Sequence, residues 1–285
     1  MQQESLKQYT TVLSIAGSDG SGGAGIQADL KTFAALGCYG LSVITGITVQ
    51  NTRGVFESAA LPASLVTRQL EVLVEDITIN AVKIGMVSSS ATVEAIAETL
   101  QNRLSAPVIL DTVLKSSSGT DLASSASKKS IVKELFPLAA LVTPNLPEAA
   151  ELAGSTHLPV EKSDIEKTAE KLRNMGASAV LIKGGHMTGN YCEDYLLSSE
   201  DGEWFSSPRV RTQNTHGTGC TLSSAIAAYS AKGYDLHEAV RKGRQFTVEA
   251  LQAGAGLILG HGAGPLHHFY RYRDDDRPRG TRPME

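Results

Sequence analysis

The regular alternation of short apolar runs with longer amphipathic stretches is the feature that most constrains the fold of this chain. The apolar runs, such as residues 12–16 and 81–84, have the length of strands and are too short for helices. Between them, apolar residues recur at helical spacing, as Val93, Ile96 and Leu100 do. Strands that alternate with helices in this way predict a mostly parallel sheet covered by helices on both faces.

This pattern extends along most of the 285 residues and predicts one α/β domain. Right-handed crossovers place the loops that follow parallel strands along one edge of the sheet, where ligands usually bind. Residues 191–204 break the alternation and predict a hairpin at the edge of the sheet. The expected strands are residues 12–16, 39–49, 81–84, 107–110, 140–142 and 179–182, and the expected helices are residues 26–36, 62–74, 93–104, 148–152, 165–172 and 222–231.

Charge and cysteine content exclude several classes of protein. A formal net charge of -4 with dispersed Lys and Arg residues argues against a nucleic-acid or anionic-membrane partner. Cys38, Cys192 and Cys220 are widely spaced and form no CxxC pair, so we expect neither a disulfide framework nor a zinc site. No stretch approaches the roughly 20 apolar residues of a membrane span. We therefore expect a cytoplasmic protein that is neither secreted nor membrane-embedded.

The strongest candidate for chemistry is the segment 214–221, Asn-Thr-His-Gly-Thr-Gly-Cys-Thr, which runs into a predicted helix. Gly217 and Gly219 lack side chains, so backbone N–H groups there can converge on an anion, and the positive end of the helix dipole adds to the field. Such a nest fits a transferring phosphoryl group. Cys220 would have its thiol pKa lowered from about 8.5 at the helix N-terminus and could then take a proton from an attacking hydroxyl.

The alternative is a purely structural role for this segment, as a tight turn shaped by glycines with Cys220 as a small buried thiol. His216 adjoins the turn, and a single histidine in such a place is more often a packing or hydrogen-bonding residue than a base. The sequence of the segment alone leaves the two interpretations open.

The glycine-rich loop at residues 17–25 follows the first predicted strand and formally contains a GxGxxG pattern. The acidic residue expected about 20 positions later in a dinucleotide site is missing, and no Gly-Lys-Ser/Thr ending makes the loop a P-loop. A loop that closes over a small flat substrate is the better interpretation. Asp29 and Gln50, near the ends of this strand–helix–strand unit, offer in-plane hydrogen bonds to a heteroaromatic ring, or serve as ordinary cap and strand-end residues.

Six short motifs occur in the order Ala16-Gly17-Ser18-Asp19, Ser21-Gly22-Gly23-Ala24-Gly25-Ile26-Gln27-Ala28-Asp29, Ile84-Gly85-Met86, Thr143-Pro144-Asn145, Lys183-Gly184-Gly185-His186 and Gly217-Thr218-Gly219-Cys220. Together they closely resemble the hydroxymethylpyrimidine/phosphomethylpyrimidine kinases of the ribokinase-like superfamily, over roughly residues 11–269. The resemblance implies a three-layer α/β/α sandwich with no separate lid domain. It also implies ATP and Mg²⁺ as cofactors, and a homodimer or larger homo-oligomer.

The resemblance further implies roles for individual residues. Gln50 would read the polar edge of a pyrimidine, and Met86 would pack on its face. The whole pyrimidine site would comprise Ala24, Asp29, Gln50, Met86, Val113 and Cys220.

For phosphoryl transfer, the resemblance implies that Cys220 is the base within a catalytic nest that includes Gly217 and Gly219. Lys183 would steady the nucleotide phosphates beside Thr218 and Gly219. Glu148 would help to hold Mg²⁺ through water. Without the resemblance, Lys183 would be interpreted as a surface lysine that follows a strand, and Glu148 as an acid favoured in the first turn of a helix.

The expected activity is ATP-dependent phosphorylation of 4-amino-5-hydroxymethyl-2-methylpyrimidine and then of its monophosphate, in thiamin biosynthesis. One alternative is a pyridoxal or pyridoxine kinase of the same superfamily, because some of these enzymes share the Gly-Thr-Gly-Cys loop. Another is an inactive protein that binds the vitamin precursor. The presence of Lys183, Glu148 and Cys220 speaks against the inactive protein.

Two features depart from the family pattern. Gly20 stands where we expect proline, which would make the substrate loop more mobile. The charged, proline-containing segment 271–285 is an extension that we expect to be disordered. The predicted organisation is therefore an N-terminal extension at residues 1–10, a kinase domain at residues 11–270 and a tail at residues 271–285.

Overall fold

The computed structural model describes residues 7–116, 119–185, 187, 189–199 and 201–272 of the chain. Most of the predicted N-terminal extension (residues 1–10) and of the predicted tail (residues 271–285) therefore lies outside the described residues. Within the described part, no helix is both long and apolar enough to cross a membrane.

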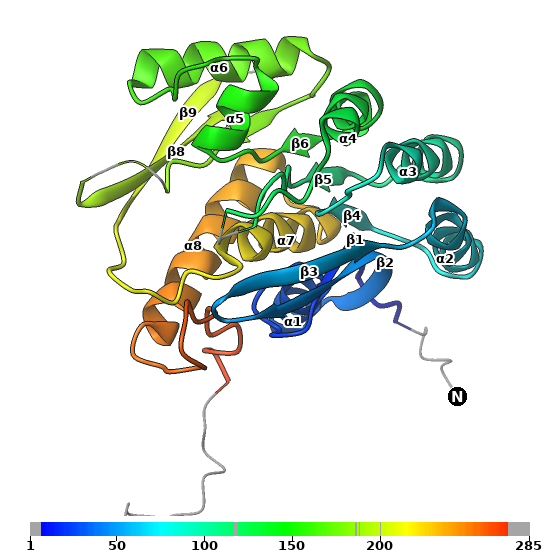
Figure 1. The fold of residues 1–285 in the computed structure, drawn as a ribbon, viewed down its shortest axis with the longest axis horizontal. Coiled ribbons are helices and arrows are strands. Elements are labelled where there is room, and N and C mark those ends of the chain that lie inside the picture. The colour runs from blue at the N-terminus through cyan, green and yellow to red at the C-terminus, as the bar shows by residue number, and fades with distance from the viewer. Residues whose placement is uncertain (1–6, 117–118, 186, 188, 200, 273–285) are drawn as a thin grey trace, which may run out of the picture.

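A single sheet runs through the middle of the molecule (Figure 1). Its described strands are β1 (Thr11–Asp19), β2 (Tyr39–Asn51), β3 (Gly54–Ala60), β4 (Ala81–Ile84), β5 (Val108–Leu110), β6 (Leu141–Val142), β7 (Val180–Ile182), β8 (Tyr191–Leu197) and β9 (Gly202–Pro208). They lie in the order β3-β2-β1-β4-β5-β6-β7-β8-β9. The strands from β2 to β7 pair in parallel, whereas β3, β8 and β9 pair antiparallel at the two edges. The predicted parallel sheet and its edge hairpin are confirmed.

Helices cover both faces of this sheet and complete a three-layer sandwich (Figure 1). Their bounds are α1 (Gly25–Ala35), α2 (Ala63–Asp76), α3 (Ser90–Arg103), α4 (Ser125–Ser130), η1 (Ile131–Leu135), η2 (Phe136–Leu138), α5 (Leu146–Leu152), α6 (Lys162–Asn174), α7 (Thr218–Ala231) and α8 (Leu236–Gly254). One hydrophobic core, which includes Leu70 and Ile96, lies under α2 to α6. A second core, which includes Phe33 and Phe246, lies under α1, α7 and α8. The predicted three-layer α/β/α sandwich is confirmed.

Strand β1 shows how the sequence places a polar site inside this apolar frame. Leu13 and Ile15 point into one core and Val12 into the other, as the alternation of a strand requires. Ser14 points to the same side as Val12, and its hydroxyl donates to the buried carboxylate of Asp29 in α1 at 2.5 Å. The register with β2 shifts between Ala16 and Gly17, and the two strands then stay paired as far as Asp19, where the glycine-rich loop continues.

Among the described elements that were not predicted are the short helices α4, η1 and η2, the strand β3 and the long helix α8. The side chains of β3 are mostly exposed, so its sequence carries no alternation between a buried and an exposed face. Helix α8 does carry a signal: the side chain of Asp235 accepts from the backbone N–H of Glu238 at 2.8 Å, and Ala239, Val240 and Phe246 are buried on one side. Helix α7 begins at Thr218 rather than at residue 222, so Gly219 and Cys220 belong to its first turn.

Candidate active site

A cavity of about 930 Å³ opens where the chain leaves the carboxyl ends of the central parallel strands. The N-terminal turn of α7 lines it on one side and the start of α5 on another. The sequence-predicted residues that line it are Ala24, Gln50, Met86, Val113, Glu148, Lys183, Gly217, Thr218, Gly219 and Cys220. The structure therefore brings together all of the predicted site residues except Asp29.

Two glycines allow the substrate loop and the start of α7 to meet. Gly217 has a φ of +81°, and a Cβ atom there would lie 1.8 Å from the carbonyl oxygen of Gly23. A Cβ atom on Gly23 would in turn lie 2.3 Å from Cδ2 of His216. Neither position has room for a side chain, so the backbone of the predicted nest packs directly against residues 23 and 24 of the substrate loop.

Gly219 serves a different purpose in the same turn. A Cβ atom on Gly219 would lie 3.2 Å from Nζ of Lys183. The missing side chain therefore lets the ammonium approach the backbone N–H groups at the start of α7. A helix N-terminus and a lysine ammonium this close together are groups that suit a phosphate.

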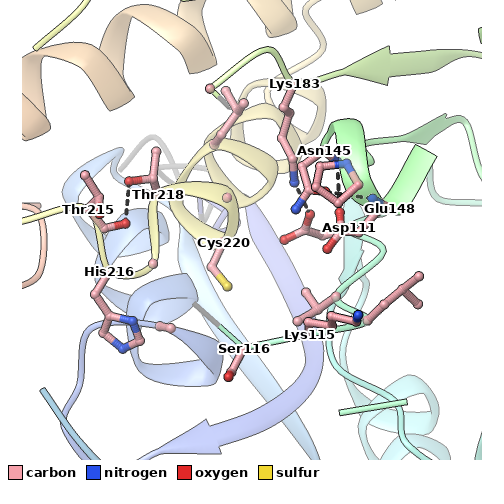
Figure 2. Close-up of a pocket in the computed structure, with 18 of the residues that line it drawn as sticks. Asp111, Lys115, Ser116, Asn145, Glu148, Lys183, Thr215, His216, Thr218 and Cys220 are labelled. Atoms are coloured by element: carbon pink, nitrogen blue, oxygen red, sulfur yellow. Dashed lines mark hydrogen bonds and ion pairs between the residues drawn. The ribbon is translucent and has the colours of Figure 1, made fainter. Parts of the chain in front are cut away.

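Cys220 lies between the two sides of the cavity. In Figure 2, His216 lies on one side of its sulfur, and Lys183, Asp111 and Glu148 lie on the other. Burial raises the pKa of the Cys220 thiol to about 11, against the opposing charge of Lys83. The prediction of a lowered thiol pKa is therefore wrong: the partial desolvation of the thiol outweighs the effect of the positive groups around it on its pKa.

Lys183 and Asp111 form a charged pair beside the start of α7. Lys183 Nζ lies 2.7 Å from Asp111 Oδ1, and the Asp111 carboxylate also accepts from the hydroxyls of Thr143 at 3.2 Å and Ser223 at 3.3 Å. Burial works against the charged form of Asp111, but Lys183 and Lys83 outweigh it and hold its pKa below the usual range. Asp111 also lines the cavity. No role was predicted for it from the sequence, although it directly follows a predicted buried strand.

Glu148 is held by the start of helix α5. Its Oε2 atom accepts from the backbone N–H of Asn145 at 2.8 Å, and the Asn145 side chain accepts from the backbone N–H of Glu148 at 2.9 Å. This capping box gives the carboxyl group a fixed position in the cavity wall. Burial raises the pKa of Glu148 to about 7, with Lys183 opposing the shift and Asp111 adding to it.

The donors on this side fit a magnesium ion. Among the described residues, no group of three or more His, Cys, Asp or Glu side chains is arranged to hold a metal by itself. Mg²⁺ is usually held by one or two carboxylates together with waters and substrate phosphates, so it needs no all-protein cage. The buried carboxyl group of Glu148 and the neighbouring Asp111, which both line the cavity, match that pattern.

Asp29 does not lie where the sequence analysis expected it. Its carboxylate is fully buried beneath the cavity. It accepts from Lys83 Nζ at 2.9 Å through both oxygens, and from the hydroxyls of Ser14 at 2.5 Å and Ser224 at 2.7 Å. These four contacts use the acceptor positions of the group. The prediction that Asp29 bonds to a substrate ring is therefore corrected: it holds Lys83.

Lys83 is the buried cation that the sequence analysis missed. It is fully buried in β4 yet lines the cavity near Cys220. Burial disfavours its charged form, but the carboxylate of Asp29 more than compensates and raises its pKa. A lysine inside a four-residue apolar strand is itself the signal that could have found it, because an unpaired lysine is almost never fully buried.

The remaining predicted residues form the other half of the cavity. Met86 is 7% exposed, and its side chain crosses Gly17, where a Cβ atom would lie 2.3 Å from Met86 Cε. The backbone N–H of Val113 donates to the carbonyl of Asp111 at 2.9 Å in a tight turn after β5. Gln50, at the end of β2, lies beside His216. An apolar wall with one amide group suits a small heteroaromatic ring.

A family model and curated relatives match most of this chain. The family described as phosphomethylpyrimidine kinase matches residues 19–267. A hydroxymethylpyrimidine/phosphomethylpyrimidine kinase of Rhizobium meliloti (strain 1021) is 46% identical over 92% of this chain and 98% of the relative. The thiamine biosynthesis bifunctional protein ThiED of Geobacter sulfurreducens is 42% identical over 93% of this chain and 53% of the relative.

Solved structures share the fold. The ADP complex of a pyridoxal kinase from Bacillus subtilis has a TM-score of 0.84 and 32% sequence identity, and the match covers 93% of this chain and 99% of that one.

Proposed function

This chain belongs to the phosphomethylpyrimidine kinase family, and we propose that it transfers phosphoryl groups from ATP to 4-amino-5-hydroxymethyl-2-methylpyrimidine and then to the resulting monophosphate, in thiamin biosynthesis. The observation that carries the proposal is the meeting of two half-sites in one cavity. Gln50 and Met86 line the half suited to a small ring, and the glycine turn with Lys183 lines the half suited to a phosphate. Cys220 lies between the two halves (Figure 2).

On the phosphate side, the backbone N–H groups at the start of α7 would bind the transferring phosphoryl group. Lys183 would neutralise charge on the nucleotide phosphates, because its ammonium already lies against that turn. Asp111 keeps the Lys183 ammonium in place at 2.7 Å. Glu148 and Asp111 would hold Mg²⁺, which when bound supplies further neutralisation of phosphate charge.

On the acceptor side, Cys220 would take the proton of the hydroxymethyl group. A thiol with a pKa of about 11 is protonated in the resting protein, so it would first release its proton to solvent and then accept the hydroxyl proton as the thiolate. Lys83 is the group whose charge favours that loss. A neutral resting thiol also avoids repelling the second acceptor, a monophosphate with a charge of about -1.5 to -2.

A coupled assay of ADP release tests this proposal. With Mg-ATP, the protein should turn over the hydroxymethylpyrimidine and its monophosphate, and Cys220→Ala should lose at least about 100-fold in kcat, since positioned general bases contribute that much. Cys38→Ala is the matched control, because Cys38 is buried in the core and does not line the cavity. Turnover of pyridoxal alone would instead indicate a vitamin B6 kinase, and silence with all three acceptors would indicate a binding protein.

The same proposal includes a homodimer or larger homo-oligomer and a cytoplasmic location, as the family resemblance implies. The small-molecule acceptor and ATP are its only proposed ligands apart from Mg²⁺.

A further inference from the structure

Four side chains form a connected group along one wall of the cavity, and all four line it: Asp19, Thr48, Gln50 and His216. His216 Nε2 lies 2.8 Å from Asp19 Oδ2 and 3.1 Å from the atom assigned as Gln50 Nε2. The other end of the amide, assigned as Oε1, lies 3.1 Å from Thr48 Oγ1. A 180° rotation interchanges the two ends of an amide, so the partners have to decide its orientation.

Asp19 is the fixed point of this group. Its Oδ1 atom accepts from the backbone N–H and the hydroxyl of Ser21 at 2.8 and 2.7 Å, and its Oδ2 atom accepts from the backbone N–H groups of Gly23 at 3.1 Å and Ala24 at 2.9 Å. Burial opposes ionisation, but the hydrogen bonds from His216 and Ser21 outweigh it and hold the pKa of Asp19 well below its usual range. Asp19 is therefore an anion with no proton to give, and His216 Nε2 must be the donor of the 2.8 Å bond.

A protonated Nε2 atom cannot accept a hydrogen bond from an amide N–H group. The amide oxygen of Gln50 must therefore face His216. Thr48 gives a second, independent constraint: its only hydroxyl hydrogen is donated to the carbonyl of Ser18 at 2.9 Å, so toward Gln50 it can only accept. Both contacts require the same orientation, with Gln50 Oε1 toward His216 and Nε2 toward Thr48.

We propose that His216, held by Asp19, is a positioning residue that fixes the amide of Gln50 and thereby sets which heteroaromatic edge the cavity accepts. In this orientation the amide still has one oxygen lone pair and one N–H group to offer, side by side. The amide N–H group can donate to a ring nitrogen while the amide oxygen accepts from an exocyclic amino group beside it. A ring N–H group beside a carbonyl presents the reverse pattern and is disfavoured. The identity of the ring rests on the proposed function, whereas the orientation of the amide does not.

The first test needs no turnover. Long-range ¹H–¹⁵N NMR spectra of the intact, ligand-free protein report which ring nitrogen of His216 carries a proton. The expected result is a protonated Nε2 atom. An Nε2 atom without a proton would make His216 an acceptor, reverse the orientation of the amide and overturn the inference, whatever the protein phosphorylates.

The second test compares substrate discrimination in His216→Met and His216→Gln. Methionine fills similar space without a donor, and glutamine restores an N–H group near the position of Nε2. Wild type should prefer the aminopyrimidine over its 4-oxo analogue in kcat/KM. His216→Met should lose about tenfold or more of that preference, since only the contact with Thr48 then holds the amide and the reversed orientation becomes accessible, and His216→Gln should recover it.

The change should lie mainly in KM, because the amide binds the ring and does not take part in the transfer. If His216→Met lowers kcat/KM equally for the aminopyrimidine and its 4-oxo analogue, and His216→Gln restores neither, His216 has a purely structural role and the inference is overturned. If wild type phosphorylates neither ring, the proposed function fails, and the NMR result still decides the orientation of Gln50.

Discussion

At the scale of single residues, the site depends on two lysines that reach the cavity from the interior. Lys83 is fully buried against Asp29, and Lys183 is paired with Asp111. Each carboxylate compensates for the burial of a cation, and each cation then adds positive charge near Cys220. Removing either carboxylate would leave a buried charge without its partner.

Glu148 provides a prediction about stability as well as activity. Its pKa is about 7 in the folded protein and would be near 4.5 in the unfolded chain, so the fold binds the extra proton between these values. Stability is therefore lost as the pH rises from about 4.5 to 7, where the buried carboxylate becomes charged. Glu148→Gln removes this cost and keeps a side chain that can complete the capping box.

We expect Glu148→Gln to gain stability over wild type as the pH rises. Measured by urea unfolding, the unfolding free energy of the variant minus that of wild type should be on the order of 2 kcal/mol larger at pH 8 than at pH 5. Its Mg²⁺-dependent turnover should fall, because an amide is a weaker ligand than a carboxylate. Glu148→Ala is the control for the lost cap and should be destabilised at both values of pH. An equal effect of Glu148→Gln on stability at pH 5 and pH 8 would contradict the account.

At the scale of helices and strands, hydrophobic periodicity predicted most of the central elements. The buried strands β1, β4 and β5 appear as apolar runs because both of their faces are covered. The edge strand β3 has no buried face and so leaves no such pattern. The start of α7 was placed late because Gly217 and Gly219 indicate a loop, although only Gly217 has left-handed backbone.

The β2–β3 ribbon provides the prediction at this scale. Ile47, Val49 and Phe56 are 50%, 55% and 68% exposed at the edge of the sheet. Exposed apolar side chains on a ribbon at the edge of a sheet favour association, and we expect a second copy of the chain to cover them.

Light scattering on the intact protein should therefore report a homo-oligomer, and Phe56→Glu should shift it toward the monomer. Val160→Glu is the matched control, since Val160 is 58% exposed in the segment before α6 and lies apart from this ribbon in the sequence. A wild-type protein that is monomeric at micromolar concentration, or equal effects of the two variants, would contradict this expectation.

At the scale of the whole molecule, the site exists only after the sheet has assembled. Asp19 and His216 are separated by 197 positions, and Lys183 and Asp111 by 72, yet each pair lies within 2.8 Å. Motifs could predict that residues 17–25 and 214–221 matter, because glycines at helix starts have a physical purpose. They could not predict that burial would raise the pKa of Cys220 or that Asp29 would pair with Lys83, because both depend on what the fold packs around these groups.

The central claim is that this one cavity phosphorylates the pyrimidine twice. ³¹P NMR of a reaction that contains the intact protein, Mg-ATP and hydroxymethylpyrimidine as the only acceptor tests it directly. The account predicts a pyrimidine monophosphate signal that rises first and then gives way to the two coupled signals of a diphosphate ester. If ATP is consumed and no phosphorus becomes attached to the pyrimidine, or if the monophosphate accumulates and is never converted, the account is contradicted.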